Sequence, residues 1–311
     1  MGAVLCLVSA AGFGAMAIFG KFAYQAGVSP QSLLLVRFAL AAVLLGTVVV
    51  LQPGLRRAPG GRGRVLAVAL ALGAVGYAAQ ASLFFAALQR MNASLLSLIL
   101  YTYPVLVTVT AVLLGRDRLT PGRVAALAAA SGGTLLVLLG AGGGSFPLIG
   151  ALLGFGAAVT YTAYILVADT VVHRLPPVLL STLVMAGAAG TLGARTLVAG
   201  GPDLGFGPAG WFWLSCIAVV STVLAMLAFF AGLKRTGPST AAILSTFEPV
   251  VTTALATLSL GETLTPVQLA GGVLVLSSVV ILQARPTRIR RATMDQREPG
   301  YSERAVPART I

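Results

Sequence analysis

Apolar runs of about twenty residues recur along the whole chain, separated by short turns and by two longer polar loops, 52–64 and 195–209. A helix of this length covers about 30 Å of hydrocarbon, because it rises about 1.5 Å per residue. Helices also satisfy their backbone polar groups internally, as lipid requires. The pattern predicts ten transmembrane helices, near 2–20, 31–51, 65–88, 93–114, 123–141, 147–168, 177–194, 210–232, 239–260 and 266–283.

The composition agrees with this pattern and excludes most soluble classes. Hydrophobic residues make up 57% of the 311 positions and charged residues 9%, whereas a soluble domain carries about a quarter charged residues. The net charge of +13 does not indicate a nucleic-acid partner, because the basic residues lie in short loops and in one tail. We therefore expect an all-α integral membrane protein surrounded by membrane lipid, with no nucleic-acid partner.

Lys and Arg are distributed unevenly between the two sets of connections. One side would hold the N-terminus, the tail and the connection after each even-numbered span, and with them 17 of the 21 basic residues. The other side would hold only Lys21, Arg90 and Arg195. Cytoplasmic loops are enriched in Lys and Arg. We expect a multi-pass protein of the bacterial inner membrane with both termini in the cytoplasm, and a disordered basic cytoplasmic tail over 284–311.

The chain repeats itself. Residues 84–90 read FFAALQR and residues 229–235 read FFAGLKR, and the triplet Leu-Thr-Pro at 119–121 recurs in the same frame at 264–266. Each copy holds five expected spans, an odd number, so the copies would lie in opposite orientations across the membrane. This predicts two inverted five-helix repeats, 1–141 and 147–283. Inverted repeats are typical of secondary transporters, in which the substrate site lies between the halves near the membrane midplane.

The end of each copy carries a motif. Residues 246–283, TFEPVVTTALATLSLGETLTPVQLAGGVLVLSSVVILQ, resemble the closing motif of the EamA family in the drug/metabolite transporter (DMT) superfamily. The first-half run YTYPVLVTVTAVLLGRDRLTPGRVAALAAASGGTLLVL is similar in weaker form, and LLLVRFALAAVLL around Arg37 resembles the second-helix pattern of the family. The resemblance implies a ten-helix fold, cytoplasmic termini and export of small metabolites or drugs. This sequence has Tyr103 in the first half where the second has Glu248.

Glu248 is the first candidate for solute binding. It falls near the middle of the expected ninth span beside Pro249, and Ser245, Glu248 and Thr252 share one helical face. An ionisable residue at this depth is costly and normally faces protein or water. Its carboxylate would bind a substrate amine or couple protons, and the alternative is a structural carboxylate near backbone loosened by Pro249.

Further polar and aromatic residues inside the spans are candidates for the lining of a solute site. Tyrosines and an amide suit a planar or amphipathic solute. With Glu248, the expected substrate-binding set is Tyr101, Tyr103, Gln80, Tyr77, Tyr161, Tyr164, Ser245 and Thr246. Interfacial anchoring of the tyrosines and plain helix packing of Gln80 are the alternatives.

Three residues are expected to have gating or structural roles. Pro104 and Pro249 each remove a helical hydrogen bond and would leave a carbonyl free for a ligand or a hinge. Arg37 lies about two turns into the second span, where snorkelling to the outer interface or a structural salt bridge is favoured over substrate contact.

Together these features predict a secondary transporter that exports small metabolites, such as amino acids, nucleobases or drug-like solutes, by alternating access. It would work as a monomer or a weak homodimer, with protons as one option for coupling. The alternatives are a membrane-embedded channel and a lipid-acting membrane enzyme. No catalytic residues, metal ligands or cofactors are expected, because eight acids and one His provide no zinc spacing or nucleophile–base set.

Overall fold

The computed structural model describes residues 1–52, 54, 62–115, 121–139, 147–172, 174–236, 244–245 and 247–283. Within these ranges the regular elements are all helices. They are α1 (Gly2–Gln25), α2 (Pro30–Leu51), α3 (Arg62–Ala71), η2 (Leu72–Tyr77), α4 (Ala78–Leu88), α5 (Ala93–Leu100), α6 (Tyr103–Leu113), α7 (Pro121–Leu139), α8 (Leu148–Val172), α9 (Pro177–Val198), α10 (Pro208–Ala218), η3 (Val219–Leu224), α11 (Ala225–Thr236), α13 (Phe247–Leu260) and α14 (Pro266–Gln283).

The described part of the chain contains six helices that are long and apolar enough to cross a membrane. They coincide with six of the expected spans, and their bounds are Gly2–Gln25, Pro30–Leu51, Gly63–Leu88, Leu148–Ala168, Pro177–Val198 and Pro208–Phe229. The four other expected spans coincide with shorter apolar helices, Ala93–Val107, Val124–Gly133, Phe247–Leu260 and Pro266–Ser278. The structure therefore confirms an all-helical, multi-pass membrane protein, while the exact count of ten stays a prediction.

The expected fourth span is not one straight helix. Two residues, Tyr101 and Thr102, separate α5 from α6, and the Thr102 hydroxyl donates to the carbonyl oxygen of Ile99 at 2.8 Å. Pro104 lies in the first turn of α6, where its missing N–H leaves no helical hydrogen bond unmade. Pro104 therefore begins a helix, whereas the sequence predicted that it interrupts one. Pro249 lies in α13, and residues 244–245 before that element are also helical, so its expected role stays a prediction.

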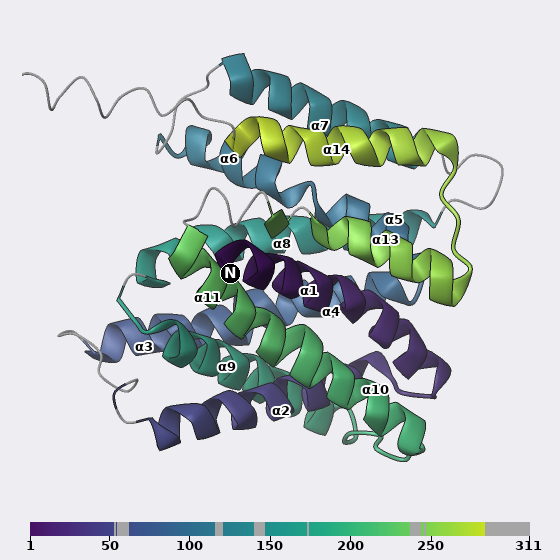
Figure 1. Ribbon diagram of the computed structural model, residues 1–311. Coiled ribbons are helices and arrows are strands. Elements are labelled where there is room, and N and C mark those ends of the chain that lie inside the picture. The colour runs from purple at the N-terminus through teal and green to yellow at the C-terminus, as the bar shows by residue number, and fades with distance from the viewer. Residues whose placement is uncertain are drawn as a thin grey trace, which may run out of the picture.

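The two halves pack in corresponding ways. Helix α1 of the first half packs on four elements of the second half, α10, η3, α11 and α13. Helix α8 of the second half packs on four elements of the first half, η2, α4, α5 and α6. Helix α5 also packs on α13, and two further pairs bring equivalent helices together: α2 with α9, and α7 with α14. The last pair forms its own layer at the top of Figure 1. The two short π-helical turns, η2 and η3, also occupy corresponding places in the halves.

Side chains of the bundle divide into a packed interior and an apolar exterior. The largest fully buried side chains include Phe38, Phe85, Leu88 and Met185. Many large apolar side chains lie on the outside instead, such as Leu51, which is 75% exposed, and Leu258, which is 84% exposed. An exterior of this kind is favourable only in contact with lipid or another apolar surface.

Polar contacts tie the halves together at one end of the bundle. The Glu262 carboxylate, between α13 and α14, accepts hydrogen bonds from the backbone N–H groups of Ala93 and Ser94 at 2.9 and 3.0 Å. It also accepts one from the Ser94 hydroxyl at 2.9 Å. In this way an acid of the second half caps the first turn of α5. A further hydrogen bond between the halves joins the Ser32 hydroxyl, as donor, to the backbone carbonyl of Asp203 at 2.6 Å.

Helix α9 crosses the η2 region at very close range. A Cβ added at Gly187 would collide with the carbonyl oxygen of Leu70 and lie 2.8 Å from the backbone nitrogen of Ala74. A Cβ added at Gly73 would meet the backbone of Val184 in the same crossing. Small residues at such contacts let helix backbones approach closely in membranes.

We therefore expect Gly187→Ala to destabilise the protein by about 1–3 kcal/mol, because backbone atoms must move to admit the methyl group. Gly190→Ala is the matched control in the same helix, since a Cβ there has no atom within 4 Å, and alanine favours a helix by about 1 kcal/mol. Thermal unfolding in detergent measures both. Equal melting temperatures for the two variants would contradict the close crossing.

Candidate functional site

Five of the predicted tyrosines form a continuous row through the interior. Ring centroids are 5.5 Å apart for Tyr77–Tyr164, 5.9 Å for Tyr164–Tyr161, 4.7 Å for Tyr161–Tyr103 and 5.7 Å for Tyr103–Tyr101. We call these five residues the tyrosine row. Contacts at these distances are those of stacked and edge-to-face aromatic pairs.

The tyrosine row passes between the two halves of the chain. Tyr77 ends η2, Tyr101 lies in the break between α5 and α6, and Tyr103 begins α6. All three belong to the first half. Tyr161 and Tyr164 lie one turn apart on α8, in the second half. The row therefore crosses the boundary between the halves at Tyr77–Tyr164 and again at Tyr161–Tyr103.

Glu248 lies at one end of the tyrosine row. The Tyr101 hydroxyl is 3.0 Å from Oε2 of Glu248 and 2.5 Å from the backbone carbonyl oxygen of Ser245. Ser245 therefore contributes its carbonyl to this contact. Tyr101 itself is 3% exposed, so its phenol is held against acceptors of the second half inside the bundle. Thr246, the remaining predicted residue of this segment, lies outside the described residues.

Helix α1 packs closely against the Glu248 turn. A Cβ at Gly14 would lie 2.9 Å from the Glu248 carbonyl oxygen, so only glycine fits this approach. The hydroxyl of Thr252, one turn along α13, lies 3.0 Å from the Gly14 carbonyl and 3.1 Å from that of Glu248. The Thr162 hydroxyl of α8 lies 3.5 Å from the Tyr103 carbonyl. Tyr103 and Glu248, which the repeat aligns, are thus each approached by the first helix of the opposite half.

Arg37 lies at the other end of the tyrosine row. Its Nε donates to the Thr222 hydroxyl at 3.0 Å and its Nη2 to the Tyr77 hydroxyl at 3.3 Å. The guanidinium carbon lies 4.9 Å from the ring centroid of Phe38 and 5.6 Å from that of Phe85. Only 2% of Arg37 is exposed. The expectation that Arg37 snorkels to the interface is therefore wrong, because hydroxyls and rings hold the cation inside the protein.

The alternative expectation for Arg37, a salt bridge, is also not what the described residues show. The carboxylate of Glu248 is held by Tyr101 and that of Glu262 by the start of α5. Asp203 accepts from the backbone N–H of Gly205. Among the residues that the structure describes, no carboxylate pairs with Arg37.

Sequence reasoning missed Thr222. Thr222 is 1% exposed in η3, where its hydroxyl also donates to the carbonyl of Ile217 five residues earlier, as a π-helical turn permits. The pair Ser221–Thr222 inside an otherwise apolar run was the available signal. Gln80 is buried in α4, and no hydrogen bond joins it to the tyrosine row among the described residues, so its role stays a prediction.

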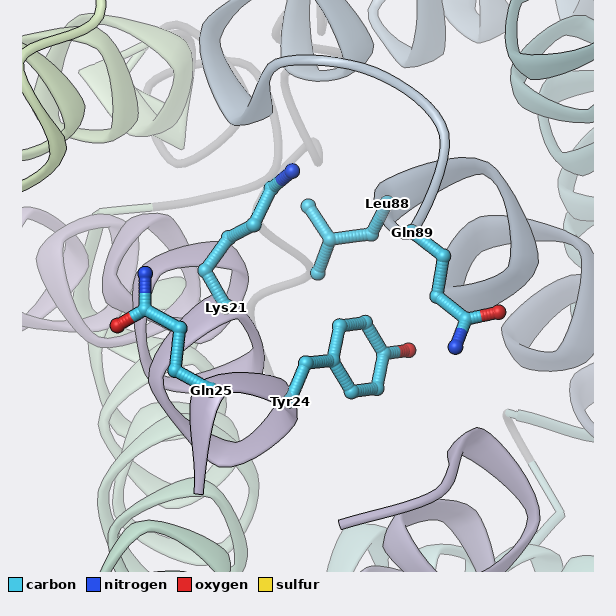
Figure 2. A pocket seen from close by; sticks show the side chains of 5 residues that line it. All are labelled: Lys21, Tyr24, Gln25, Leu88 and Gln89. Atoms are coloured by element: carbon cyan, nitrogen blue, oxygen red, sulfur yellow. The ribbon is translucent and has the colours of Figure 1, made fainter. Parts of the chain in front are cut away.

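Two cavities lie at the end of the bundle that holds Lys21. The first has a volume of about 380 Å³ and is drawn in Figure 2, with Lys21, Tyr24 and Gln25 on α1 facing Leu88 and Gln89. In its wall, Lys21 Nζ donates to the Met91 carbonyl and the Tyr24 hydroxyl to the Phe85 carbonyl, both at 2.8 Å.

The second cavity, of about 690 Å³, shares Gln89 with the first and includes Arg90 and Arg195. Neither cavity is lined by the tyrosine row, whose rings contact one another. Among the described residues, no group of three or more His, Cys, Asp or Glu side chains gathers to hold a metal ion.

Comparison with known proteins gives three findings. The sequence model of the EamA-like transporter family matches residues 1–139 and 148–283. A Bacillus subtilis (strain 168) protein named Uncharacterized transporter YcbK is 28% identical over 279 residues, which are 87% of this chain and 88% of that protein. A protein of known crystal structure has a similar fold, with a TM-score of 0.62 over 90% of this chain and 96% of that chain. At 19% identity, this last likeness concerns the fold alone.

The Tyr101 hydroxyl is expected to matter for stability. Tyr101→Phe leaves the Glu248 carboxylate and the Ser245 carbonyl without their shared donor, so it should destabilise the protein by about 1–3 kcal/mol. Tyr161→Phe removes an equivalent hydroxyl that has no hydrogen bond among the described residues, and it should change stability by less than about 0.5 kcal/mol. Thermal unfolding of both variants measures the difference. A Tyr161→Phe variant as unstable as Tyr101→Phe would show that the contact across the halves contributes nothing.

Proposed function

Because the chain belongs to the EamA-like transporter family of the DMT kind, we propose that it exports small metabolites by alternating access and binds them along the tyrosine row. The family and the relative named a transporter both point to a transporter rather than an enzyme. A transporter of this kind acts on a small-molecule solute from within the lipid bilayer.

The observation that carries the proposal is the position of Glu248. Its carboxylate lies inside the bundle beside the Tyr101 hydroxyl, at the end of a row of rings that passes between the two halves. Rings supply flat apolar surfaces and attract cations, and the carboxylate supplies an acceptor for an amine. Amino acids, nucleobases and amine-bearing drug-like solutes combine these features. We assign their binding to Tyr77, Tyr101, Tyr103, Tyr161, Tyr164 and Glu248, with Ser245, Thr246 and Gln80 in supporting positions.

Alternating access would arise from the two-fold pattern of the fold. In the proposal, ten helices form two inverted halves, 1–141 and 147–283, which rock about the tyrosine row. The corresponding packing of α1 and α8 supports this, because each contacts helices of the opposite half. The Glu262 contacts with Ala93 and Ser94 would hold one end closed. Pro104, in the first turn of α6, and Pro249, in α13, are the proposed hinges.

The orientation and driving force complete the proposal. The excess of Lys and Arg on one side supports an inner-membrane protein with both termini and the basic tail in the cytoplasm. Arg64, Arg174 and Arg235 are described residues of that side. Export is driven by a proton gradient or by the gradient of the solute itself, and flux measured with and without a pH gradient separates the two.

Binding should depend on the Glu248 carboxylate. A solute present at about one hundred times its dissociation constant stabilises its protein by about 2.7 kcal/mol. We expect amine-bearing amino acids or drugs to give such a shift with the wild-type protein and none with Glu248→Gln. Asp203→Asn is the matched control, because it makes the same carboxylate-to-amide change in the loop between α9 and α10. Thermal shift of the purified variants measures both, and stabilisation that survives in Glu248→Gln would remove Glu248 from the site.

A further inference from the structure

We propose that Arg37 binds an anionic group, most simply a carboxylate, on the transported solute. This inference rests on the proposed function, because it gives the same tyrosine row a second charged end. It extends that function by naming a substrate class, namely solutes that carry a carboxylate or a similar planar anion.

The charge of Arg37 has no counter-charge among the described residues. Three carboxylate side chains are described by the structure, those of Asp203, Glu248 and Glu262. Each of them has hydrogen-bond partners other than Arg37. The groups around the cation are neutral. They are two hydroxyls and the rings of Phe38, Phe85 and Tyr77. A buried cation of this kind attracts an anion more strongly than one that is already paired or in water.

The geometry of the guanidinium leaves an edge for that anion. The Thr222 and Tyr77 hydroxyls accept from Nε and Nη2, two nitrogens that share one edge of the planar group. Nη1, which forms the end edge with Nη2, has no acceptor among the described residues. A pair of parallel N–H groups is the arrangement that binds a carboxylate in bidentate fashion.

Arg37 is also joined to the row that the solute would occupy. Because the Tyr77 hydroxyl accepts from Nη2, its own proton is free to donate to a ligand. The Tyr77 ring then continues to Tyr164 at 5.5 Å. The two residues that hold Arg37 lie in the two π-helical turns, Tyr77 in η2 and Thr222 in η3. Such turns occur frequently at functional sites.

A purely structural role for Arg37 makes a different prediction. Hydroxyls and rings could hold the cation only to join η2 with η3, and any substitution would then lower stability without changing which solutes bind. A carboxylate-binding role changes the preference for acids over their amides. The decisive quantity is therefore the ratio of affinities within a matched pair of solutes.

The experiment measures the dissociation constants of two such pairs, phenylalanine against phenylalaninamide and orotate against uracil. The proteins are the wild type, Arg37→Lys and Arg90→Lys. Arg37→Lys keeps the positive charge but loses the paired N–H groups of the guanidinium. Arg90→Lys makes the same change at an exposed residue of the second cavity. We expect the wild type and Arg90→Lys to prefer the acid in at least one pair. We expect Arg37→Lys to lower that preference at least tenfold, or about 1.4 kcal/mol.

Tyr77→Phe is the second variant, used if Arg37→Lys does not fold. It keeps Arg37 but removes the hydroxyl that holds Nη2, and it should lower the same preference. Two results overturn the inference: a wild type that binds amide and uracil as tightly as the acids, or an acid preference that survives both variants. Glu248→Gln tested on the same pairs keeps the two proposals apart. If amine binding survives in that variant, the role of Glu248 fails, while the acid preference still reports on Arg37.

Discussion

A charged side chain inside a lipid-facing bundle has no water to solvate it, so the protein must supply its partners. Glu248 and Arg37 meet this constraint from opposite ends of the tyrosine row. Glu248 receives the Tyr101 hydroxyl from the other half of the chain, and Arg37 reaches the Thr222 hydroxyl from the other half in the same way. Both charges therefore depend on the halves being together, and any relative movement of the halves must change how these charges are satisfied.

The alternating access that we propose requires such movement. The halves meet through small residues, as at Gly14 beside the Glu248 carbonyl and Gly187 beside Leu70. Contacts of this kind have little interdigitation of long side chains. Among the described residues, the polar contacts between the halves are separate hydrogen bonds, such as those of Glu262 with the start of α5. A small number of hydrogen bonds is a barrier that solute binding can offset.

Much of the fold could be predicted from the sequence, because hydropathy and charge bias act locally and lipid imposes a fixed length on each span. The tyrosines were also found from the sequence, since Tyr161 and Tyr164 repeat at helical spacing inside an apolar run. The membrane-spanning, all-helical character and the transporter family are confirmed. The inverted orientation of the second half relative to the first and the roles of individual residues stay predictions.

What the sequence did not show depends on contacts between distant segments. The partners of Arg37 come from η2 and η3, and no local pattern indicates either π-helical turn. The same is true of Glu262, whose partner Ser94 lies far away in the chain. Arg37 was expected at the interface because position along a span was considered without rotation about the helix axis. That rotation is set by tertiary packing, as the contacts of Phe38 and Tyr77 around it show.

The most direct test of alternating access is the accessibility of the tyrosine row from each side of the membrane. Tyr161 can be replaced by cysteine in a protein whose natural residues Cys6 and Cys216 are changed to serine. The protein is then placed in sealed vesicles in one orientation, and a membrane-impermeant thiol reagent is added outside or enclosed within. Our account predicts modification from both sides, because the row opens to each face in turn. Modification from one side only would contradict it.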